Sequence, residues 1–427
     1  MKSIDDIAAA LQGYDPQALS VDQVNAFLSE LVQPVSLAES QDVGVMEALG
    51  RVLAQDIISP INVPAHTNSA MDGFAFDASQ LIVDQPLTLR VVGTALAGKA
   101  WPGQVHIGEC LKIMTGAILP DGLDTVVPQE FCETHKTDDV TTITLPPNLL
   151  KPGDNRRLVG EDLAQGQAAL KMGQHLTPAA LGLIASLGLP SVRVHRRLRV
   201  AYFSTGDEVL SLGDAPREGA VFDSNRYTVF GLLTRLGCEV IDMGVVRDDP
   251  ALLEAAFAKA AHTADAIITS GGVSVGEADF TKAMMKKLGD VAFWKIAMRP
   301  GRPMAVGRIG KSVLFGLPGN PVAVMVTFLA FIRPALLRMM GSTAQPAPLL
   351  RAQSIEPLRK KAGRTEYQRG FVSRTADGTL HVRTTGNQGS GVLSSMVQGN
   401  GLIVLHHAQG NVAVGDMVDV MMFEGAI

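Results

Sequence analysis

The chain has 427 residues, 46% of them apolar, a composition typical of a soluble protein with roughly two to four packed domains. Its 37 basic and 42 acidic residues give a net charge of −5, which argues against nucleic acid or an anionic membrane as the main partner. Three widely spaced cysteines exclude a disulfide framework and a cysteine zinc site, and they fit the reducing cytoplasm.

Targeting signals are not expected at the start of the chain. The first residues carry two aspartates and no apolar core, unlike a signal peptide, and residues 1–19 are predicted to be a poorly ordered extension. The most apolar run, Val322–Ile332, is too short to span a bilayer, so no membrane association is predicted.

Two helices are expected in residues 20–55. Ser20–Val32 has an N-cap serine and apolar residues on one face, and Ser40–Leu49 is followed by Gly50, a residue typical of helix ends. Residues 56–150 then show short β-like runs between glycines and prolines, which predicts a β-rich module. The polar stretch Asn68–Phe74 and the small-residue turn Met114–Ala117 are unusual there, although ordinary turn chemistry explains both.

Residues 151–190 contain a charged loop and a clearly delimited helix. Lys151–Asp162 concentrates arginines and carboxylates between glycines, and it is either a solvated surface or an anion-recognition loop. The helix begins with Thr177 as N-cap and Pro178 at its first position, and Gly188 ends it. We expect this helix to pack with the helices of residues 20–50, so that the β-rich module is an insertion in a discontinuous helical domain.

Strands and helices alternate over residues 191–342, which predicts a doubly wound parallel α/β sheet. Ligands bind such sheets beyond the carboxyl ends of the strands. One expected strand, Ala266–Thr269, leads into Ser270, Gly271, Gly272 and Ser274, where bare backbone N–H groups could hold a phosphate-like anion. An ordinary strand-to-helix loop with Asp279 as a helix cap is the alternative interpretation.

Charged residues follow several of these strands. Six carboxylates are predicted to lie along one rim, a pattern that suits a Mg²⁺–phosphate site or simply a solvated surface: Asp207, Glu208, Asp248, Asp249, Glu277 and Asp279. Lys295, Arg299 and Arg302 supply the opposite charge, and flanking prolines hold the two arginines. Residues 347–427 are expected to form a small β-barrel, in which Arg369 and the Gly389–Gly391 turn could bind an anion or merely form a hairpin.

Ten short stretches occur in the order found in one known family: NSAMDGFAF, MTGA, NRRLVGED, STGDE, RDDP, TSGGVSVGEADF, FWKIAMRPGRP, GLPGNPV, EYQRG and QGSGVLSSM. From about Ser20 to the C-terminus the chain thus resembles the molybdopterin molybdenumtransferases, the MoeA enzymes and the gephyrin E domain. The resemblance implies a multidomain α+β homodimer, with an active site between the α/β domain of one subunit and parts of the other. It also implies the reaction: adenylated molybdopterin and molybdate react with Mg²⁺, AMP is released, and molybdenum remains on the dithiolene.

The resemblance also assigns roles by position. The implied catalytic residues are Asp72, Asp162, Glu208, Asp279 and Lys295. The implied Mg²⁺ ligands are Glu208, Asp248 and Asp279. The implied substrate-binding residues are Thr115, Ser270, Gly271, Gly272, Ser274, Arg299, Arg302, Pro318, Pro321, Arg369 and Ser390. The chain departs from the family in having Arg299 and Arg302 where lysines are common, and Ala323 where serine is common, which affects the expected molybdate coordination.

Two other functions share parts of this sequence pattern. An adenylyltransferase that prepares the adenylated pterin uses the same type of α/β domain, but the extra helical, inserted and barrel parts favour molybdenum insertion. A receptor-clustering scaffold is the second alternative, and the chain lacks the long Pro/Ser-rich linker typical of one. The adenylyltransferase and apo-molybdenum enzymes are the expected protein partners, in the cytoplasm.

Overall fold

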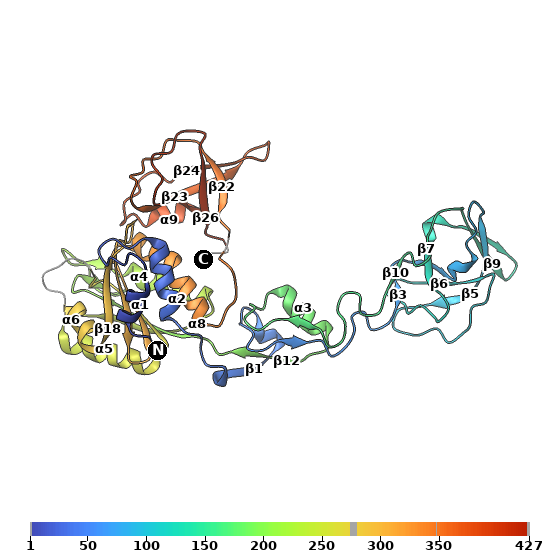
Figure 1. The fold of residues 1–427 in the computed structure, drawn as a ribbon, viewed down its shortest axis with the longest axis horizontal. Helices are drawn as coiled ribbons and strands as arrows, with labels where there is room; N and C mark the ends of the chain where they lie inside the picture. Colours follow the sequence, from blue (N-terminus) through green and yellow to red (C-terminus); the bar gives the residue numbers. More distant parts are fainter. Residues whose placement is uncertain (1, 274–279, 347, 425–427) are drawn as a thin grey trace.

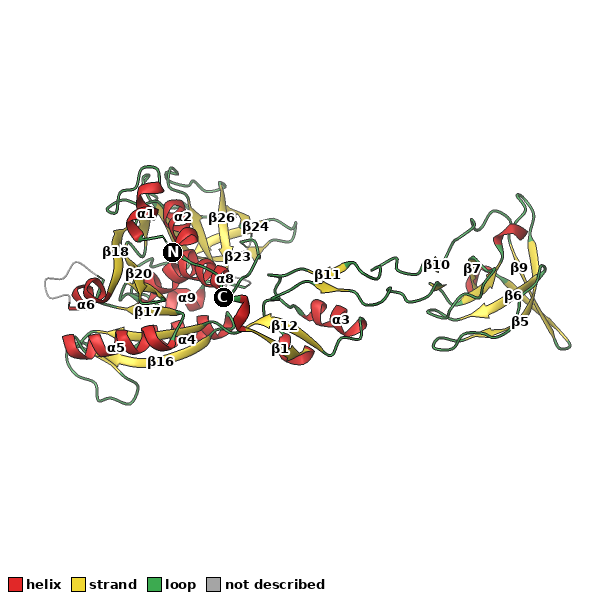
Figure 2. Cartoon of the chain, turned by 60° about the horizontal axis from the view of Figure 1, so that its bottom comes forward, coloured by secondary structure: helices red, strands yellow, loops and turns green. Residues whose placement is uncertain are grey.

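The computed structural model describes residues 2–273, 280–346 and 348–424. They form an elongated molecule, with an α/β domain and a β-barrel at one end, a narrow arm in the middle and a β-rich insert at the other end (Figures 1 and 2). The predicted fold class, a multidomain α+β protein with a central α/β domain and a C-terminal β-barrel, is confirmed.

The N-terminal segment is folded, so the prediction of a poorly ordered extension is wrong. Helix α1 (Ile4–Ala10) has a Ser3 capping box and buries Ile4 and Ile7, which are one turn apart. The backbone of the following segment bonds to the α/β domain, because the Lys295 N–H donates to the Pro16 carbonyl over 2.8 Å. Two apolar residues at helical spacing are thus enough to dock this short helix.

Helix α2 (Val21–Leu31) agrees with the prediction, including its Ser20 cap and its buried apolar face. It packs into the core of the α/β domain, however, and not against the helix that begins at Pro178. The predicted helix Ser40–Leu49 is wrong. These residues form strand β1 (Ser40–Gly44) and the 3₁₀ helix Val45–Ala48, because β1 pairs with the distant strand β12 (Ser191–His195).

The arm consists of two chain segments that run side by side (Figure 2). Strand β1 pairs with β12, and β2 (Ile57–Ile58) pairs with β11 (Ala168–Leu170). Helix α3 (Pro178–Ser186) has the predicted Thr177 cap and packs against Val45–Ala48 over a small apolar core. Further out, β3 (Asn68–Ser69) pairs with β10 (Arg156–Arg157) where the arm meets the insert.

The insert is a six-stranded sheet. Its order is β7-β4-β6-β5-β9-β8. In chain order, its strands are β4 (Gly73–Phe76), β5 (Leu87–Ala95), β6 (Glu109–Ile113), β7 (Thr125–Pro128), β8 (Glu133–Thr137) and β9 (Val140–Leu145). Apolar clusters cover both faces of this sheet, so the insert has cores of its own at the far end of the arm.

The α/β domain contains a six-stranded sheet of order β16-β13-β17-β21-β20-β18. Its strands are β13 (Arg199–Thr205), β16 (Glu239–Val246), β17 (Ala266–Ser270), β18 (Gly289–Lys295), β20 (Pro303–Ile309) and β21 (Ser312–Leu317). The first four strands in the sheet order are parallel, as predicted, but β20 is antiparallel to both of its neighbours. A two-residue connection joins β20 to β21, and such a short turn forces antiparallel pairing.

Helices cover both faces of this sheet. Helices α4 (Ser224–Arg235) and α7 (Pro321–Thr327) contribute to one core, and α5 (Pro250–Thr263) and α6 (Phe280–Leu288) to the other. Helix α7 continues through a π-helical turn (Phe328–Ile332) into α8 (Arg333–Met339). This run of 19 residues is long and apolar enough to cross a membrane, yet 72% of its apolar window is buried, as in a core helix.

The C-terminal domain is a closed barrel of five strands plus α9 (Ser394–Gln398). Its strands are β22 (Leu350–Ser354), β23 (Thr365–Arg374), β24 (Leu380–Thr384), β25 (Gly401–Leu405) and β26 (Met417–Met422). The short strand β19 (Met298–Arg299) of the α/β domain pairs with β23. This pairing ties the barrel to the loop that carries the predicted arginines.

Two histidines at the junction of the arm and the α/β domain predict acid sensitivity. His175 lies 2.8 Å from the Ser342 hydroxyl, and burial lowers its pKa. Burial also lowers the pKa of His195, whose ring packs against Gly341 and whose Nδ1 has no hydrogen-bond partner among the residues that the structure describes. The unfolded chain therefore binds more protons than the folded chain as the pH falls through the ordinary histidine pKa. Stability should be complete above about pH 6.5 and decline below it.

Urea unfolding between pH 5 and pH 8 measures this effect. The double variant His175→Gln, His195→Gln should lose less stability on acidification than the wild type, by about 1.4 kcal/mol for each pKa unit by which folding lowers the two histidines. Equal acid sensitivity of the two proteins would contradict the assignment to these histidines.

Candidate active site

Predicted rim carboxylates lie at the ends of two neighbouring parallel strands. Residues 206–208 follow β13, and the Asp248 N–H after β16 donates to Asp207 Oδ1 over 3.3 Å. Gly206 has a φ of 133°, and a Cβ there would lie 2.5 Å from a Glu208 carboxylate oxygen. Glycine therefore allows the exposed Glu208 side chain to fold back over the turn.

Strand β17 ends in a buried network of hydroxyl groups. The Tyr202 hydroxyl lies 2.7 Å from the Ser270 Oγ and 2.9 Å from the Ser204 Oγ, so the Ser270 side chain already has partners within the protein. Its predicted role in substrate binding remains a prediction.

The two glycines that follow Ser270 are required by close contacts. A Cβ at Gly271 would lie 2.4 Å from the Thr205 carbonyl oxygen, and one at Gly272 would lie 2.5 Å from the Thr281 Cβ. Both glycines have positive φ, so the turn after β17 adopts the conformation that the sequence predicted. The predicted residues Ser274 and Asp279 lie outside the described residues.

Two of the three predicted Mg²⁺ ligands, Glu208 and Asp248, belong to the described residues. Glu208 and Asp248 offer hard oxygen ligands, the type that Mg²⁺ prefers, so the donor chemistry of this rim fits the ion. Within residues 2–273, 280–346 and 348–424, no group of three His, Cys, Asp or Glu side chains is close enough to hold a metal alone. Mg²⁺ usually keeps water and substrate phosphate among its ligands, so two protein carboxylates are sufficient for such a site.

The predicted cations lie at the same edge of the sheet. Strand β18 is antiparallel to β20, and β20 to β21, so β18 runs in the direction of β21 and ends at the same edge. Lys295 is the last residue of β18, the exposed Arg299 ends the short strand β19, and the exposed Arg302 directly precedes β20. The sheet thus brings cations and carboxylates to one edge, the former beyond β18 and the latter beyond β13 and β16.

The GLPGNP turn that carries Pro318 and Pro321 is held from two sides. Asn225 Nδ2 of α4 donates to the Gly319 carbonyl over 2.7 Å. The Val322 N–H in the first turn of α7 donates to the Ser390 carbonyl of the barrel over 3.1 Å. The predicted residue Ser390 therefore contacts the turn through its backbone, which joins the barrel to the α/β domain at the candidate site.

Arg369 lies beneath the Ser390 loop and is 1% exposed. Its guanidinium donates to Ser395 Oγ over 2.9 Å, to the Gly389 carbonyl over 2.9 Å and to the Asn387 carbonyl over 3.3 Å. Burial, with a smaller contribution from the positive charge of Arg299, lowers the pKa of Arg369 to about 10, so it stays charged at neutral pH. Its predicted contact with molybdate is untested, and the structure adds a role in holding this loop.

The remaining predicted residues lie at the other end of the molecule. Asp72 accepts hydrogen bonds from the Thr115 N–H over 2.7 Å and from the Thr115 hydroxyl over 2.8 Å. These bonds lower the pKa of the Asp72 carboxyl, and they favour its charged form. Asp162 is exposed in the loop after β10, and its N–H donates to the Val63 carbonyl over 3.0 Å. Within one chain, the arm separates the insert from the α/β domain and its rim (Figures 1 and 2).

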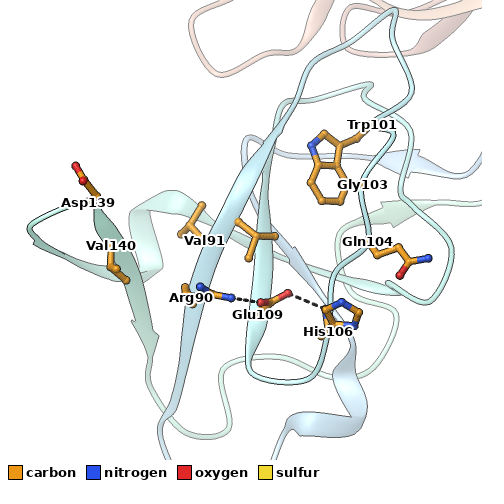
Figure 3. A pocket seen from close by; sticks show the side chains of 10 residues that line it. Arg90, Val91, Trp101, Gly103, Gln104, His106, Glu109, Asp139 and Val140 are labelled. Carbon is orange, nitrogen blue, oxygen red and sulfur yellow. Dashed lines mark hydrogen bonds and ion pairs between the residues drawn. The ribbon is translucent and has the colours of Figure 1, made fainter.

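A hollow of about 550 Å³ on the insert contains none of the predicted site residues (Figure 3). It is lined by Trp101, Gln104 and an Arg90–Glu109 ion pair, and the Glu109 carboxylate also accepts from the His106 N–H over 2.9 Å. The charges of Arg90 and Glu109 already pair with each other, so the hollow does not supply the chemistry of the candidate site.

Sequence reasoning missed several residues that shape the site. Asn225, Tyr202 and Ser204 contribute hydrogen bonds at the strand ends, and Arg217 donates to the Asp207 carbonyl. Asp223, directly before α4, was detectable as a helix cap. The Asn225–Gly319 and Tyr202–Ser270 contacts join residues far apart in sequence, so no local pattern indicated them.

Three family profiles cover most of the chain. Residues 19–188 match the MoeA N-terminal region (domain I and II), residues 201–338 a probable molybdopterin binding domain, and residues 351–423 the MoeA C-terminal region (domain IV). A molybdopterin molybdenumtransferase of Haemophilus influenzae is 42% identical over 95% of this chain and 98% of its own length. Another, from Nostoc, is 34% identical over 92% and 91%.

Solved structures agree with these matches. A molybdopterin biosynthesis MoeA protein of Pyrococcus horikoshii has a TM-score of 0.79 and 25% identity, and covers 95% of this chain and all of its own. A second structure of such a protein from that organism has a TM-score of 0.72 and 28% identity, with 95% of this chain and 99% of its own covered. The chain therefore belongs to the molybdopterin molybdenumtransferase family and is an enzyme.

Proposed function

We propose that this protein is the molybdenum insertase of molybdenum cofactor biosynthesis. It transfers molybdenum from molybdate to the dithiolene of adenylated molybdopterin, with Mg²⁺-dependent release of AMP. The observation that carries the proposal is the gathering of Glu208, Asp248, Arg299 and Arg302 at one edge of the α/β sheet, in a chain of this family.

The charges at this edge suit a reaction between two anions. Molybdate carries two negative charges and approaches a phosphoanhydride that is itself negative, so fixed cations reduce their repulsion. Arg299 and Arg302 are placed to bind the oxyanion, and Glu208 and Asp248 would hold Mg²⁺. Bound there, the ion would offset the negative charge of the phosphates. Water adds across the phosphoanhydride bond, which breaks to give AMP and the phosphate of molybdopterin. The two thiol sulfurs bind molybdenum, and one molybdate oxygen leaves as water with the two thiol protons.

We further propose that the active unit is a homodimer. Asp72 and Thr115 lie on the insert, and Asp162 lies in the loop after β10, so a second copy is needed to place them at a rim such as that of Glu208. Exposed apolar side chains on the α/β domain support an interface between copies, because Phe222, Tyr227 and Phe230 are 45%, 45% and 47% exposed.

The proposed reaction implies protein partners upstream and downstream. An adenylyltransferase must form the adenylated pterin, and apo-molybdenum enzymes must accept the product. Both the delivery of the adenylated pterin and the transfer of the product would take place in the cytoplasm.

AMP release from adenylated molybdopterin by the purified protein tests the proposal, with Mg²⁺ present and with molybdate added or omitted. We expect release that requires both ions and yields active molybdenum cofactor. Tight substrate binding without release would point to a storage or scaffold role. Formation of the adenylate from ATP and molybdopterin would assign the preceding reaction instead.

Replacing one of the exposed arginines should weaken the response to molybdate. Arg299→Ala removes a cation at the reactive edge, and we expect the molybdate concentration for half-maximal rate to rise roughly 10-fold or more. Lys311→Ala is the matched control, because Lys311 is an exposed cation in the β20–β21 turn at the opposite edge of the sheet. An unchanged molybdate response in Arg299→Ala would remove Arg299 from the molybdate site.

A further inference from the structure

The first turn of α4 contains two buried oxygen atoms that receive no hydrogen bond from the described part of the chain. They belong to Asp223 and Asn225, which are 5% and 9% exposed. Asp223 caps the helix with one oxygen, which accepts the Arg226 N–H over 3.0 Å, while its Oδ2 has no partner. Asn225 Nδ2 donates to the Gly319 carbonyl, which fixes the orientation of its amide and leaves Oδ1 without a donor.

Both residues lie at the reactive edge of the sheet. Gly319 belongs to the turn between β21 and α7, and Asn225 bonds directly to it. Asp223 lies near the Tyr202 phenol, which hydrogen-bonds to Ser270 at the end of β17. Burial raises the pKa of Tyr202, and the negative charge of Asp223 adds to this rise. The two acceptors are therefore close to the strand ends and not on a remote surface of the domain.

A buried acceptor is satisfied by internal water, by a cation or by a ligand that donates a hydrogen bond. A cation is disfavoured here, because α4 has twelve residues and the positive end of its dipole lies at this turn. A ligand with neighbouring N–H groups donates hydrogen bonds to both acceptors and brings no positive charge to the helix end.

We propose that Asp223 and Asn225 recognise the N–H donor edge of the pterin ring. This edge carries an exocyclic amine beside a ring N–H, and it presents hydrogens to Asp223 Oδ2 and Asn225 Oδ1. The adenine of the same substrate has an amine beside ring nitrogens that accept hydrogen bonds, so it complements two acceptors less well. The inference rests on the proposed function and names the contact that selects the pterin end of the substrate.

Two substitutions of Asp223 separate recognition from helix capping. Asp223→Asn keeps the capping oxygen and replaces the second acceptor with a donor, whereas Asp223→Ser keeps a capping oxygen and removes the second acceptor. Calorimetry with adenylated molybdopterin should show about 10-fold weaker binding for Asp223→Ser and about 100-fold weaker binding for Asp223→Asn. Asp77→Asn makes the same change at a capping carboxylate on the insert and should bind like the wild type.

Competition by small heterocycles identifies which edge of the substrate Asp223 and Asn225 recognise. Pterin should displace the substrate from the wild type better than lumazine, in which an oxygen replaces the exocyclic amine. Asp223→Asn should lose this preference, and AMP should compete equally in both proteins. Melting temperatures establish that each variant is folded.

Three results would overturn the inference while leaving the proposed function intact. Wild-type affinity in both Asp223 variants would mean that internal water satisfies these acceptors. Reduced binding of MgCl₂ alone with an unchanged pterin preference would identify a cation site. If Asp223→Asn kept the preference for pterin over lumazine but AMP competed less well, the first turn of α4 would bind adenine instead. Failure of the wild type itself to bind adenylated molybdopterin would instead refute the proposed function.

Discussion

Mixing two inactive variants, Asp72→Asn and Glu208→Gln, should restore roughly a quarter of wild-type turnover. Asp72 lies on the insert and Glu208 on the rim of the α/β domain, at opposite ends of one chain. If the site combines the insert of one subunit with the rim of its partner, a mixed dimer has one doubly altered site and one intact site. Half of a randomly assembled population is mixed, and each mixed dimer has half of its sites intact.

Each single variant should remain folded and lose turnover by about 100-fold or more. Both side chains are exposed and both changes preserve shape, so little packing is disturbed. Asp72 accepts two hydrogen bonds from Thr115, which favour its charged form, and the neutral amide cannot replace that charge.

Co-expression of the two variants with different affinity tags allows mixed dimers to be isolated and assayed. A pure mixed dimer should have about half of wild-type activity, because one of its two sites is intact. An inactive mixed dimer would place both residues in a site formed within one chain. Full activity of either variant alone would remove that residue from the site.

Replacing Arg369 by alanine should lower kcat/KM by about 100-fold and destabilise the barrel by about 2–4 kcal/mol. The side chain donates to two carbonyls and one hydroxyl around the Ser390 loop, and all three acceptors would lose their donor. The Ser390 carbonyl in turn accepts from the Val322 N–H in α7. The loss of one buried guanidinium is therefore expected to loosen the contact between barrel and α/β domain.

Arg369→Lys distinguishes geometry from charge. Lysine keeps the positive charge but cannot reproduce the planar fork, so most of the loss should persist if Arg369 positions the loop. Near-complete rescue by lysine would show that charge alone matters, as expected of a direct molybdate contact. Arg383→Ala is the matched control, since Arg383 is an exposed arginine of the same barrel that lies over the Phe371 ring. Its activity should stay within about twofold of the wild type.

Local signals in the sequence correctly indicated many elements. The caps of α2 and α3 and the Asp249–Pro250 start of α5 match the structure, because N-cap hydrogen bonds and proline geometry involve residues within one helical turn. The glycines after Ser270 were also informative, since close contacts and positive φ at those positions exclude a side chain. Together with the ten stretches, these features identified the family and the fold class.

The remaining features depend on contacts that a local pattern does not contain. Ser40–Gly44 forms a strand because β12, far along the chain, supplies its hydrogen-bond partner. Arg369 is buried because the Ser390 loop closes over it, and Asp72 lies far from Glu208 because the arm holds the insert away from the rim. The sequence by itself determined helix caps, turns and the types of residue available for chemistry, since these follow from neighbours along the chain. Only the tertiary structure decided which of those residues meet, because strand pairing and burial join segments whose separation leaves no periodic signal.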